Sequence, residues 1–271
     1  MSGGDILRLL RWRLALLNGM AATCGYLLYP SGIDLLQLVA VYGGTALLAA
    51  AGSTFNQVLE QDLDCVMERT KGRPLPSRVM SVSTAFVIGA ACLFCGLLCL
   101  GRTGGAVPPL IGVVTLVWYL AVYTPLKRRT ALALPIGALC GAAAPLIGWT
   151  LAGGACADHR ILLIAGVMYL WQVPHFWLLQ RRHRDDYRAA GIPLCEIATG
   201  DGRIPLCALW IIALAAGTML LPVVGIIPQI HAIWCVLFFL PLLLSFLARS
   251  EKTLFACFNL FPLLLTLMIW L

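Results

Sequence analysis

Three side chains that could bind a divalent cation recur every four residues between positions 56 and 64. They are Asn56, Glu60 and Asp64. On a continuous helix, residues four and eight positions apart stay close to one face, so we expect a stripe at the mouth of a membrane helix. Oxygen ligands of this kind suit Mg²⁺, which is often held together with a phosphate. Acidic groups at membrane depth cost roughly 2.5–3.5 kcal/mol each, which favours a functional role.

The same segment holds a further acid, Asp62. An ideal helix places Asp62 on the far side from Glu60. We therefore expect Asp62 to support the metal ligands from outside, or to join them if the helix unwinds at its end. The alternative for the whole segment is an ordinary acid-rich helix end in solvent. Acids near a helix C-terminus oppose the helix dipole, so that alternative is the less favourable one.

A second acidic pair, Asp185 and Asp186, follows a later apolar segment. Neighbouring residues point about 100° apart on a helix, so we expect one of the two to bind metal directly. The sequence leaves open which one. Carboxylates that hold Mg²⁺, with cations to take the remaining negative charge, are together what a diphosphate needs. The candidate catalytic and metal-binding residues are therefore Asn56, Glu60, Asp62, Asp64, Asp185 and Asp186.

Basic residues flank both acidic segments. The candidate diphosphate contacts are four of them and one tyrosine at the end of an apolar segment: Arg73, Arg78, Lys127, Arg128 and Tyr123. Tyr123 could instead anchor its helix at the membrane interface. For the basic residues, the alternative is the excess of Lys and Arg that cytoplasmic loops of membrane proteins carry in any case.

The composition is that of a membrane protein. Apolar residues make up 61% of the chain and charged residues 11%, and the mean hydropathy is +0.90. A spanning helix needs about 20 apolar residues, so we predict an all-α polytopic membrane protein with helices around an intramembrane cavity, in a single domain over residues 1–271. The nine predicted spans cover residues 12–30, 36–59, 81–101, 106–125, 131–152, 160–180, 205–225, 229–248 and 254–271.

The distribution of charge predicts the orientation. Of the 19 Lys and Arg residues, 17 fall on one side of the predicted spans, and only Arg102 and Arg160 fall on the other. The basic side is expected to be cytoplasmic, which places the N-terminus and the polar loops 60–80 and 181–204 there. The net charge of +7 follows from this asymmetry and gives no reason to expect a nucleic-acid partner. No small-residue cleavage site follows a short apolar core, so no cleaved signal peptide is expected.

Several longer stretches resemble a known family. They are residues 56–60, 69–76, 123–130, 141–149, 171–177 and 185–193. In these stretches the chain resembles the UbiA-type intramembrane prenyltransferases and, among them, the protoheme IX farnesyltransferases. The Trp-Gln-x-Pro-His-Phe and Asp-Tyr-x-x-Ala-Gly segments are the specific ones, whereas the acidic stripe identifies only the superfamily. Glu60 departs from the Asp that many members have, and the second acidic motif lacks a clean Asp-x-x-x-Asp spacing.

The resemblance implies a specific reaction. Farnesyl diphosphate would bind through Mg²⁺ and the two acidic clusters, and its farnesyl group would pass to the 2-vinyl group of protoheme IX (heme B) to give heme O. A membrane-embedded cavity would keep water from the allylic cation until alkylation. The resemblance also implies a bacterial inner membrane, an active site on the cytoplasmic side, and a heme-pathway membrane partner such as heme A synthase.

The acceptor site is less defined in the sequence. His175 lies in an apolar segment directly after Pro174, and Trp171 lies one turn earlier. His175 could bind the heme iron through a ring nitrogen. It could equally be a packed core histidine, and Trp171 could line the cavity or pack between helices.

Two other functions fit part of the pattern. An aromatic polyprenyltransferase of quinone synthesis would share the Mg²⁺ site and differ in its acceptor, and the Trp-Gln-x-Pro-His-Phe segment argues against it. A small-molecule transporter would also contain intramembrane acids. Transporters tend to place them near the bilayer midplane, whereas the acids here cluster at one face, which favours chemistry on a diphosphate.

Overall fold

Long apolar stretches can satisfy their backbone groups in a bilayer only by forming helices or closed barrels. The computed structural model describes residues 2–30, 32–194, 205–248 and 250–270, and every regular element within them is helical. In chain order these are α1 (Gly3–Leu10), α2 (Trp12–Leu28), α3 (Leu35–Leu59), α4 (Gln61–Val66), α5 (Val82–Gly104), α6 (Val107–Val117), the π-helix η1 (Trp118–Tyr123), α7 (Thr124–Leu126), α8 (Ala133–Leu151), α9 (His159–Arg182), α10 (Arg184–Ala189), α11 (Pro205–Val223), the 3₁₀-helix η2 (Gln229–His231), α12 (Ala232–Leu247) and α13 (Glu251–Trp270). The predicted all-α, multi-pass membrane architecture is confirmed.

Seven of the nine predicted spans correspond to long apolar helices in the described part of the chain. Within the described residues, seven helices are long and apolar enough to cross a bilayer. The predicted spans 12–30 and 205–225 correspond to α2, which has 17 residues, and to α11, whose apolar part Ala208–Val223 is also short. The count of nine therefore stays a prediction. Residues 195–204 of the predicted polar loop 181–204, which include Arg203, lie outside the described residues, as does Arg249.

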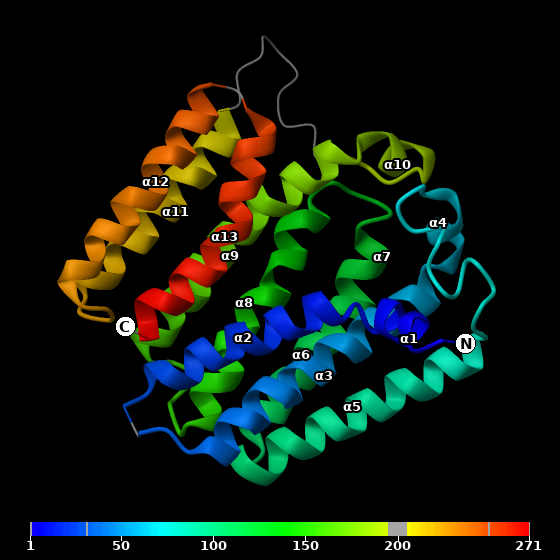
Figure 1. The fold of residues 1–271 in the computed structure, drawn as a ribbon, viewed down its shortest axis with the longest axis horizontal. Helices are drawn as coiled ribbons and strands as arrows, with labels where there is room; N and C mark the ends of the chain where they lie inside the picture. The colour runs from blue at the N-terminus through cyan, green and yellow to red at the C-terminus, as the bar shows by residue number, and fades with distance from the viewer. Residues whose placement is uncertain (1, 31, 195–204, 249, 271) are drawn as a thin grey trace.

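Close backbone approach joins α2 to α8. A Cβ atom added to Gly25 would lie 1.9 Å from the carbonyl oxygen of Pro145, and one added to Gly148 would lie 1.8 Å from that of Ala22. Membrane helices associate through such small residues, because lipid leaves little hydrophobic driving force between them. This contact fixes α2 and α8 against one another, and α3 packs along the other side of α2 (Figure 1).

The helices α11 and α13 pack against α9, and α12 packs against both of them, so that the four form a second group (Figure 1). Fully buried apolar side chains from all four helices meet in one core, among them Ile164 of α9, Leu214 of α11, Leu242 of α12 and Phe258 of α13. Apolar contact of this kind positions α9, which carries the Trp171–Trp177 segment and leads into the second acidic pair.

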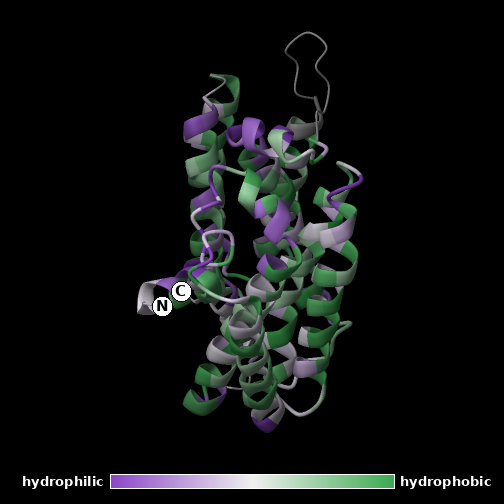
Figure 2. Ribbon diagram, turned by 90° about the vertical axis from the view of Figure 1, so that its right-hand side faces the viewer, coloured by the Kyte–Doolittle hydropathy of each residue, from purple (hydrophilic) through white to green (hydrophobic). Residues whose placement is uncertain are grey.

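The polar loops meet at one end of the molecule. The short helices α4 and α10 lie side by side there, close to α1 and to the end of α3 (Figure 1). In Figure 2, hydrophilic residues gather in the middle and upper part of the view, whereas the lower parts of the helices are mostly hydrophobic. The two acidic segments, more than a hundred residues apart in the chain, therefore share one surface.

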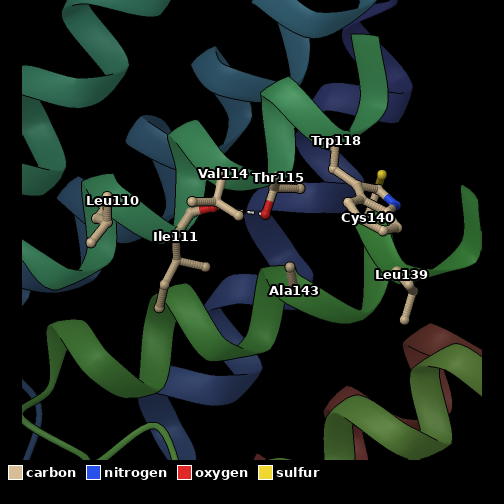
Figure 3. A pocket seen from close by; sticks show the side chains of 8 residues that line it. All are labelled: Leu110, Ile111, Val114, Thr115, Trp118, Leu139, Cys140 and Ala143. Carbon is tan, nitrogen blue, oxygen red and sulfur yellow. Dashed lines mark hydrogen bonds between the residues drawn. The ribbon is translucent and has the colours of Figure 1, made fainter. Parts of the chain in front are cut away.

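An apolar pocket of about 370 Å³ lies between α6 and α8. Figure 3 shows the side chains that line it: Leu110, Ile111, Val114, Thr115, Trp118, Leu139, Cys140 and Ala143. The hydroxyl group of Thr115, the polar group on the α6 side, is satisfied within its own helix by donating to the carbonyl oxygen of Ile111 at 2.8 Å. The pocket therefore offers a hydrocarbon-like surface on a helix that continues directly into the polar end.

Candidate functional site

The acidic stripe is built on a broken helix rather than the continuous one that the spacing predicts. Helix α3 ends at Leu59, and Glu60 has φ −120° and ψ 23°, so α4 begins as a separate helix at Gln61. The chain still places Asn56, Glu60 and Asp64 under the surface, each at most 5% exposed. The break bends the chain at Glu60, with a backbone bond on each side of it, from Glu60 to Asn56 and from Asp64 to Glu60.

Glu60 is held from two sides. One of its oxygens, Oε2, accepts from Lys127 Nζ at 2.5 Å and from Asn56 Nδ2 at 2.9 Å. The other oxygen, Oε1, is buried and has no hydrogen-bond partner in the described part of the chain. Burial lowers the pKa of Lys127, and the negative charge of Glu60 opposes that shift. The pair therefore leaves one carboxylate oxygen available at the centre of the site.

Asp64 forms an ion pair with Arg73, which lies on the loop that follows α4. Both of its oxygens accept from Arg73 Nη1, at 2.8 and 2.7 Å. The buried hydroxyl of Thr70 donates to the Asp64 carbonyl oxygen at 3.1 Å, and turns such as Arg73 N to Thr70 O fold the loop back on itself. Nine residues of sequence thus close into one ion pair.

Asp62 points away from this cluster. Its carboxylate, with 62% of the side chain exposed, accepts from both terminal nitrogens of Arg128, at 2.8 and 2.9 Å. The Arg128 hydrogen bond holds the pKa of Asp62 below its usual value. Arg128 also donates to the carbonyl oxygen of Leu59, the last residue of α3. The Asp62–Arg128 pair therefore ties the bend to α7 from outside and does not converge with Glu60.

The π-helix η1 places Thr124, the residue that follows it, in contact with Asn56. Thr124 Oγ1 donates to the carbonyl oxygen of Tyr119, five residues back, at 2.8 Å, and also to Asn56 Oδ1 at 3.0 Å. Pro125 has no backbone N–H and crowds the preceding turn, and π-helical turns are frequent at functional sites. We had not expected Thr124 in the site. The Thr-Pro pair at the end of an apolar helix was the signal that could have found it.

The two tyrosines of η1 stack on one another. The rings of Tyr119 and Tyr123 are 5.7 Å apart, and Lys127 Nζ lies 5.3 Å from the Tyr123 ring centre. A Cβ atom at Gly137 would lie 2.5 Å from that ring, so the ring fills a notch in α8. The Tyr123 ring is therefore packed against α8, and the Lys127 ammonium group lies over the face of that ring.

The predicted contact Arg78 lies apart. Its backbone has φ +57°, its side chain is exposed, and it forms no ion pair with the acids of the described residues. The sequence could not separate Arg78 from Arg73, because both follow Asp64 within fifteen residues. Loop geometry alone decides that Arg73 returns to the acid.

Asp186 joins the two acidic segments. Its two oxygens accept from the backbone N–H groups of Glu68 and Arg69, at 3.1 and 3.2 Å. Asp185 is exposed. Of the two adjacent acids, Asp186 is therefore committed to holding the loop after α4, and Asp185 is the one left for a ligand.

His175 and Trp171 face α13 rather than the acidic stripe. The His175 ring stacks on Trp171 at 5.0 Å and on Phe255 at 5.4 Å, and Trp171 Nε1 donates to the Phe258 carbonyl oxygen at 2.6 Å. Nδ1 of His175 is buried without a partner among the described residues. The ring is packed like a core residue, yet one of its nitrogens remains unused.

The donor set fits a hard divalent cation shared with phosphate. No three His, Cys, Asp or Glu side chains in the described ranges lie close enough to hold a metal by themselves. The site instead offers Glu60 Oε1, which has no partner among the described residues, with Asn56 bonded to the same carboxylate. Asp64 belongs to the same charged group, because Glu60 and Asp64 both act electrostatically on Lys127. Mg²⁺ is commonly held by one or two carboxylates, with substrate phosphates and water completing its coordination.

Comparisons with known proteins show which family the chain belongs to. A sequence model described as the UbiA prenyltransferase family matches residues 18–270. A protoheme IX farnesyltransferase of Geobacter sulfurreducens is 56% identical over 262 residues, which is 96% of each chain. One of Oleidesulfovibrio alaskensis is 39% identical over 221 residues, covering 82% of this chain and 78% of the relative.

Solved structures show the same fold at low identity. The apo structure of a UbiA homologue from Aeropyrum pernix has a TM-score of 0.79 at 19% identity, over 96% of this chain and 98% of that one. A UbiA homologue from Archaeoglobus fulgidus, bound to DMAPP and Mg²⁺, has a TM-score of 0.72 at 16% identity, over 98% and 99% of the two chains.

The bridge made by Asp186 can be tested by hydrogen exchange. Asp186→Ala removes both acceptors, and hydrogen bonds to a charged group contribute about 1.5–3 kcal/mol. We expect the amides of Glu68 and Arg69 to exchange at least about tenfold faster. Asp185→Ala, the matched control, should leave them unchanged. Equal exchange in Asp186→Ala and the unmodified protein would show that the bridge does not hold the loop.

Proposed function

Because this chain belongs to the UbiA prenyltransferase family and, within it, to the protoheme IX farnesyltransferases, we propose that it transfers the farnesyl group of farnesyl diphosphate to the vinyl group of protoheme IX (heme B), which gives heme O. The observation that carries this proposal is 56% identity over 96% of both chains with a protein of that name. In this proposal residues 1–271 act as one transmembrane prenyltransferase domain.

The diphosphate would bind where the buried acids and bases meet. Asn56, Glu60, Asp64 and the exposed Asp185 would hold Mg²⁺ there, and the bound ion would neutralise charge on the diphosphate. Lys127 and Arg73 already lie against Glu60 and Asp64, so they are in place to contact phosphate oxygens directly. Asp62 and Arg128 keep the bend in position from outside, and Asp186 does the same for the loop.

Transfer begins with heterolysis of the bond between C1 of the farnesyl group and the diphosphate oxygen. The electron pair leaves with the diphosphate, where Lys127 and Arg73 stabilise the developing charge because they are fixed before the reaction. The vinyl group of heme then forms a carbon–carbon bond to C1. The cation left on the former vinyl group takes a hydroxyl from water, whose proton returns to solvent, and a hydroxyethylfarnesyl group results.

Water must stay away until the new bond has formed. The apolar pocket between α6 and α8 supports this requirement, because it offers a surface for an isoprenoid chain on the helix that leads into η1 and Lys127. A transporter would not need a phosphate-type cluster at one face. A quinone-type enzyme would share the cluster, and the curated relatives named above favour heme as the acceptor.

The acceptor is proposed to lie along α9. His175 and Trp171 present a flat aromatic stack with an unused nitrogen, which suits a porphyrin with a ligand for its iron. A heme-pathway membrane enzyme such as heme A synthase, which would consume the product, is a proposed partner. The proposed location is the bacterial inner membrane, with the N-terminus and the acidic clusters cytoplasmic.

The orientation follows from the asymmetry of the basic residues. A reporter fused within the loop Lys127–Arg129 should report a cytoplasmic location, because that loop carries three consecutive basic residues. Green fluorescent protein and alkaline phosphatase fusions at the same site measure this. A phosphatase-active, non-fluorescent pair would reverse the proposed topology.

The reaction is tested with purified protein, heme B, farnesyl diphosphate and Mg²⁺. Mass spectrometry should detect heme O. Asp64→Asn and Asp64→Ala should lower turnover by about 100-fold or more, since each removes a charged group fixed at the site of charge development. Asp62→Ala removes an exposed ion pair, which is worth at most about 1 kcal/mol, and should change turnover less than about fivefold. Absence of heme O with the unmodified protein would refute the proposed function. A larger loss of turnover in Asp62→Ala than in Asp64→Ala would place the metal site at Asp62 instead.

The role of His175 is tested by separating the two substrates. His175→Ala should weaken heme B binding by about tenfold or more, as loss of an outer-sphere or direct metal ligand does, and should leave farnesyl diphosphate binding unchanged. Titration with each ligand alone measures this, and Phe176→Ala, on the neighbouring exposed face, is the control. Equal loss of both ligands with a lower melting temperature would assign His175 to packing alone.

A further inference from the structure

Gln172 is a polar side chain that lies inside the helix bundle without a partner. It belongs to α9, it is 5% exposed, and its carboxamide forms no hydrogen bond with any described residue. A carboxamide can donate two hydrogen bonds and accept others at its oxygen, and the bilayer interior offers nothing to satisfy such groups. Polar side chains within membrane segments are therefore read as functional by default. The unused groups of Gln172 indicate a polar ligand from outside the chain.

The backbone of α8 leaves room for this amide. A Cβ atom on Gly141 would lie 1.8 Å from Gln172 Nε2 and 2.6 Å from Oε1, so the carboxamide occupies space that a side chain at position 141 would fill. Gly137, one turn earlier on the same face of α8, receives the Tyr123 ring in the same way, at 2.5 Å. One helical turn rises about 5.4 Å. Gln172 therefore lies roughly that much further from the polar end than Tyr123, which carries the Lys127 ammonium group over its face.

Gln172 also belongs to the helix that carries the proposed acceptor site. Trp171 and His175 face α13, where His175 stacks on Phe255, whereas Gln172 faces α8. The amide thus lies between the charged cluster on one side and the acceptor stack on the other. In the proposed reaction this is where the vinyl group and C1 of the farnesyl group must meet.

Polar groups on the other side of α8 are already used within the chain. Trp118 Nε1 donates to the Ile136 carbonyl oxygen at 3.0 Å, and Thr115 Oγ1 donates to the Ile111 carbonyl oxygen at 2.8 Å. Gln172 differs from both, because its donors and its acceptor are still available for a ligand.

The last step of the proposed reaction needs one water molecule at a fixed place. Water must be kept from the allylic cation before alkylation, yet one molecule must add to the cation that alkylation leaves on the former vinyl group. A single buried water meets both demands if polar groups hold it, and such a water makes about two to four hydrogen bonds. A carboxamide suits this task because it offers donors and an acceptor and carries no charge.

We propose that Gln172 is the positioning residue for this water. The inference rests on the proposed function. The water oxygen forms a bond to the carbon that bears the positive charge, one of its O–H bonds breaks, and that proton returns to solvent. Where no water is held, the same cation instead loses a proton from the adjacent carbon and becomes an alkene, which is lighter than heme O by one water. Gln172 thereby decides which product forms and on which face of the cation the oxygen arrives.

The test follows the products that the full-length protein makes from heme B, farnesyl diphosphate and Mg²⁺. Mass spectrometry gives the ratio of alkene to heme O, and chiral chromatography gives the configuration of the hydroxyl-bearing carbon. Gln172→Met keeps the length of the side chain and removes the amide. We expect the ratio of alkene to heme O to rise about tenfold, the effect of losing one hydrogen bond. The heme O that still forms should lose its single configuration, and farnesyl diphosphate binding should be unchanged.

Two further variants separate the position of the amide from other effects. Gly141→Ala retains Gln172 but fills the space of its carboxamide, so it should shift the products in the same direction. Gln180→Met makes the same chemical change two turns along α9 toward the polar end, and its products should match those of the unmodified protein.

An equal product ratio and configuration in Gln172→Met and the unmodified protein overturns the inference. Weaker heme B binding with an unchanged product ratio assigns the amide to a propionate of the acceptor. A lower melting temperature with proportional loss of both products assigns it to packing. Either of these results overturns the inference as well. An unmodified protein that makes no farnesylated porphyrin contradicts the proposed function, and the inference with it, before any residue is changed.

Discussion

The structure depends on keeping two acidic side chains, each in an ion pair, below the surface at the end of a membrane helix. Glu60 and Asp64 stay buried because Lys127 and Arg73 reach them from other segments. Removing one partner of such a pair typically costs about 3–5 kcal/mol, because an uncompensated charge remains. The bend at Glu60, the returning loop and the π-helical turn can therefore be understood as the means by which one chain brings four charges together.

The same pairing explains how a site can be stable when empty and still accept a diphosphate. Each acid is neutralised by a cation that could turn to a phosphate oxygen, and each cation is balanced by an acid that could turn to a metal. Binding exchanges partners rather than burying new unpaired charge. Glu60 Oε1, which has no hydrogen-bond partner among the described residues, is the atom at which this exchange is incomplete.

Much of the fold could be predicted from the sequence, because apolar length and charge asymmetry act locally. The grouping of Asn56, Glu60 and Asp64 follows from helical periodicity, although the helix breaks at Glu60. The sequence could not tell Arg73 from Arg78, since loop closure decides between them, and it did not indicate Thr124, which enters the site through a π-helical turn.

Asp186 has a consequence for the energetics of the polar loop. Two consecutive backbone amides that point at one anion form a small concave donor site, of the type that holds phosphate in other proteins. Here the anion belongs to the chain itself, so Asp186 acts as an internal ligand for the turn at Glu68 and Arg69. The conformational entropy of that turn is thus lost once, during folding, rather than at each encounter with substrate. The loop is ordered before the donor binds, so the free energy of donor binding is not reduced by the cost of ordering it.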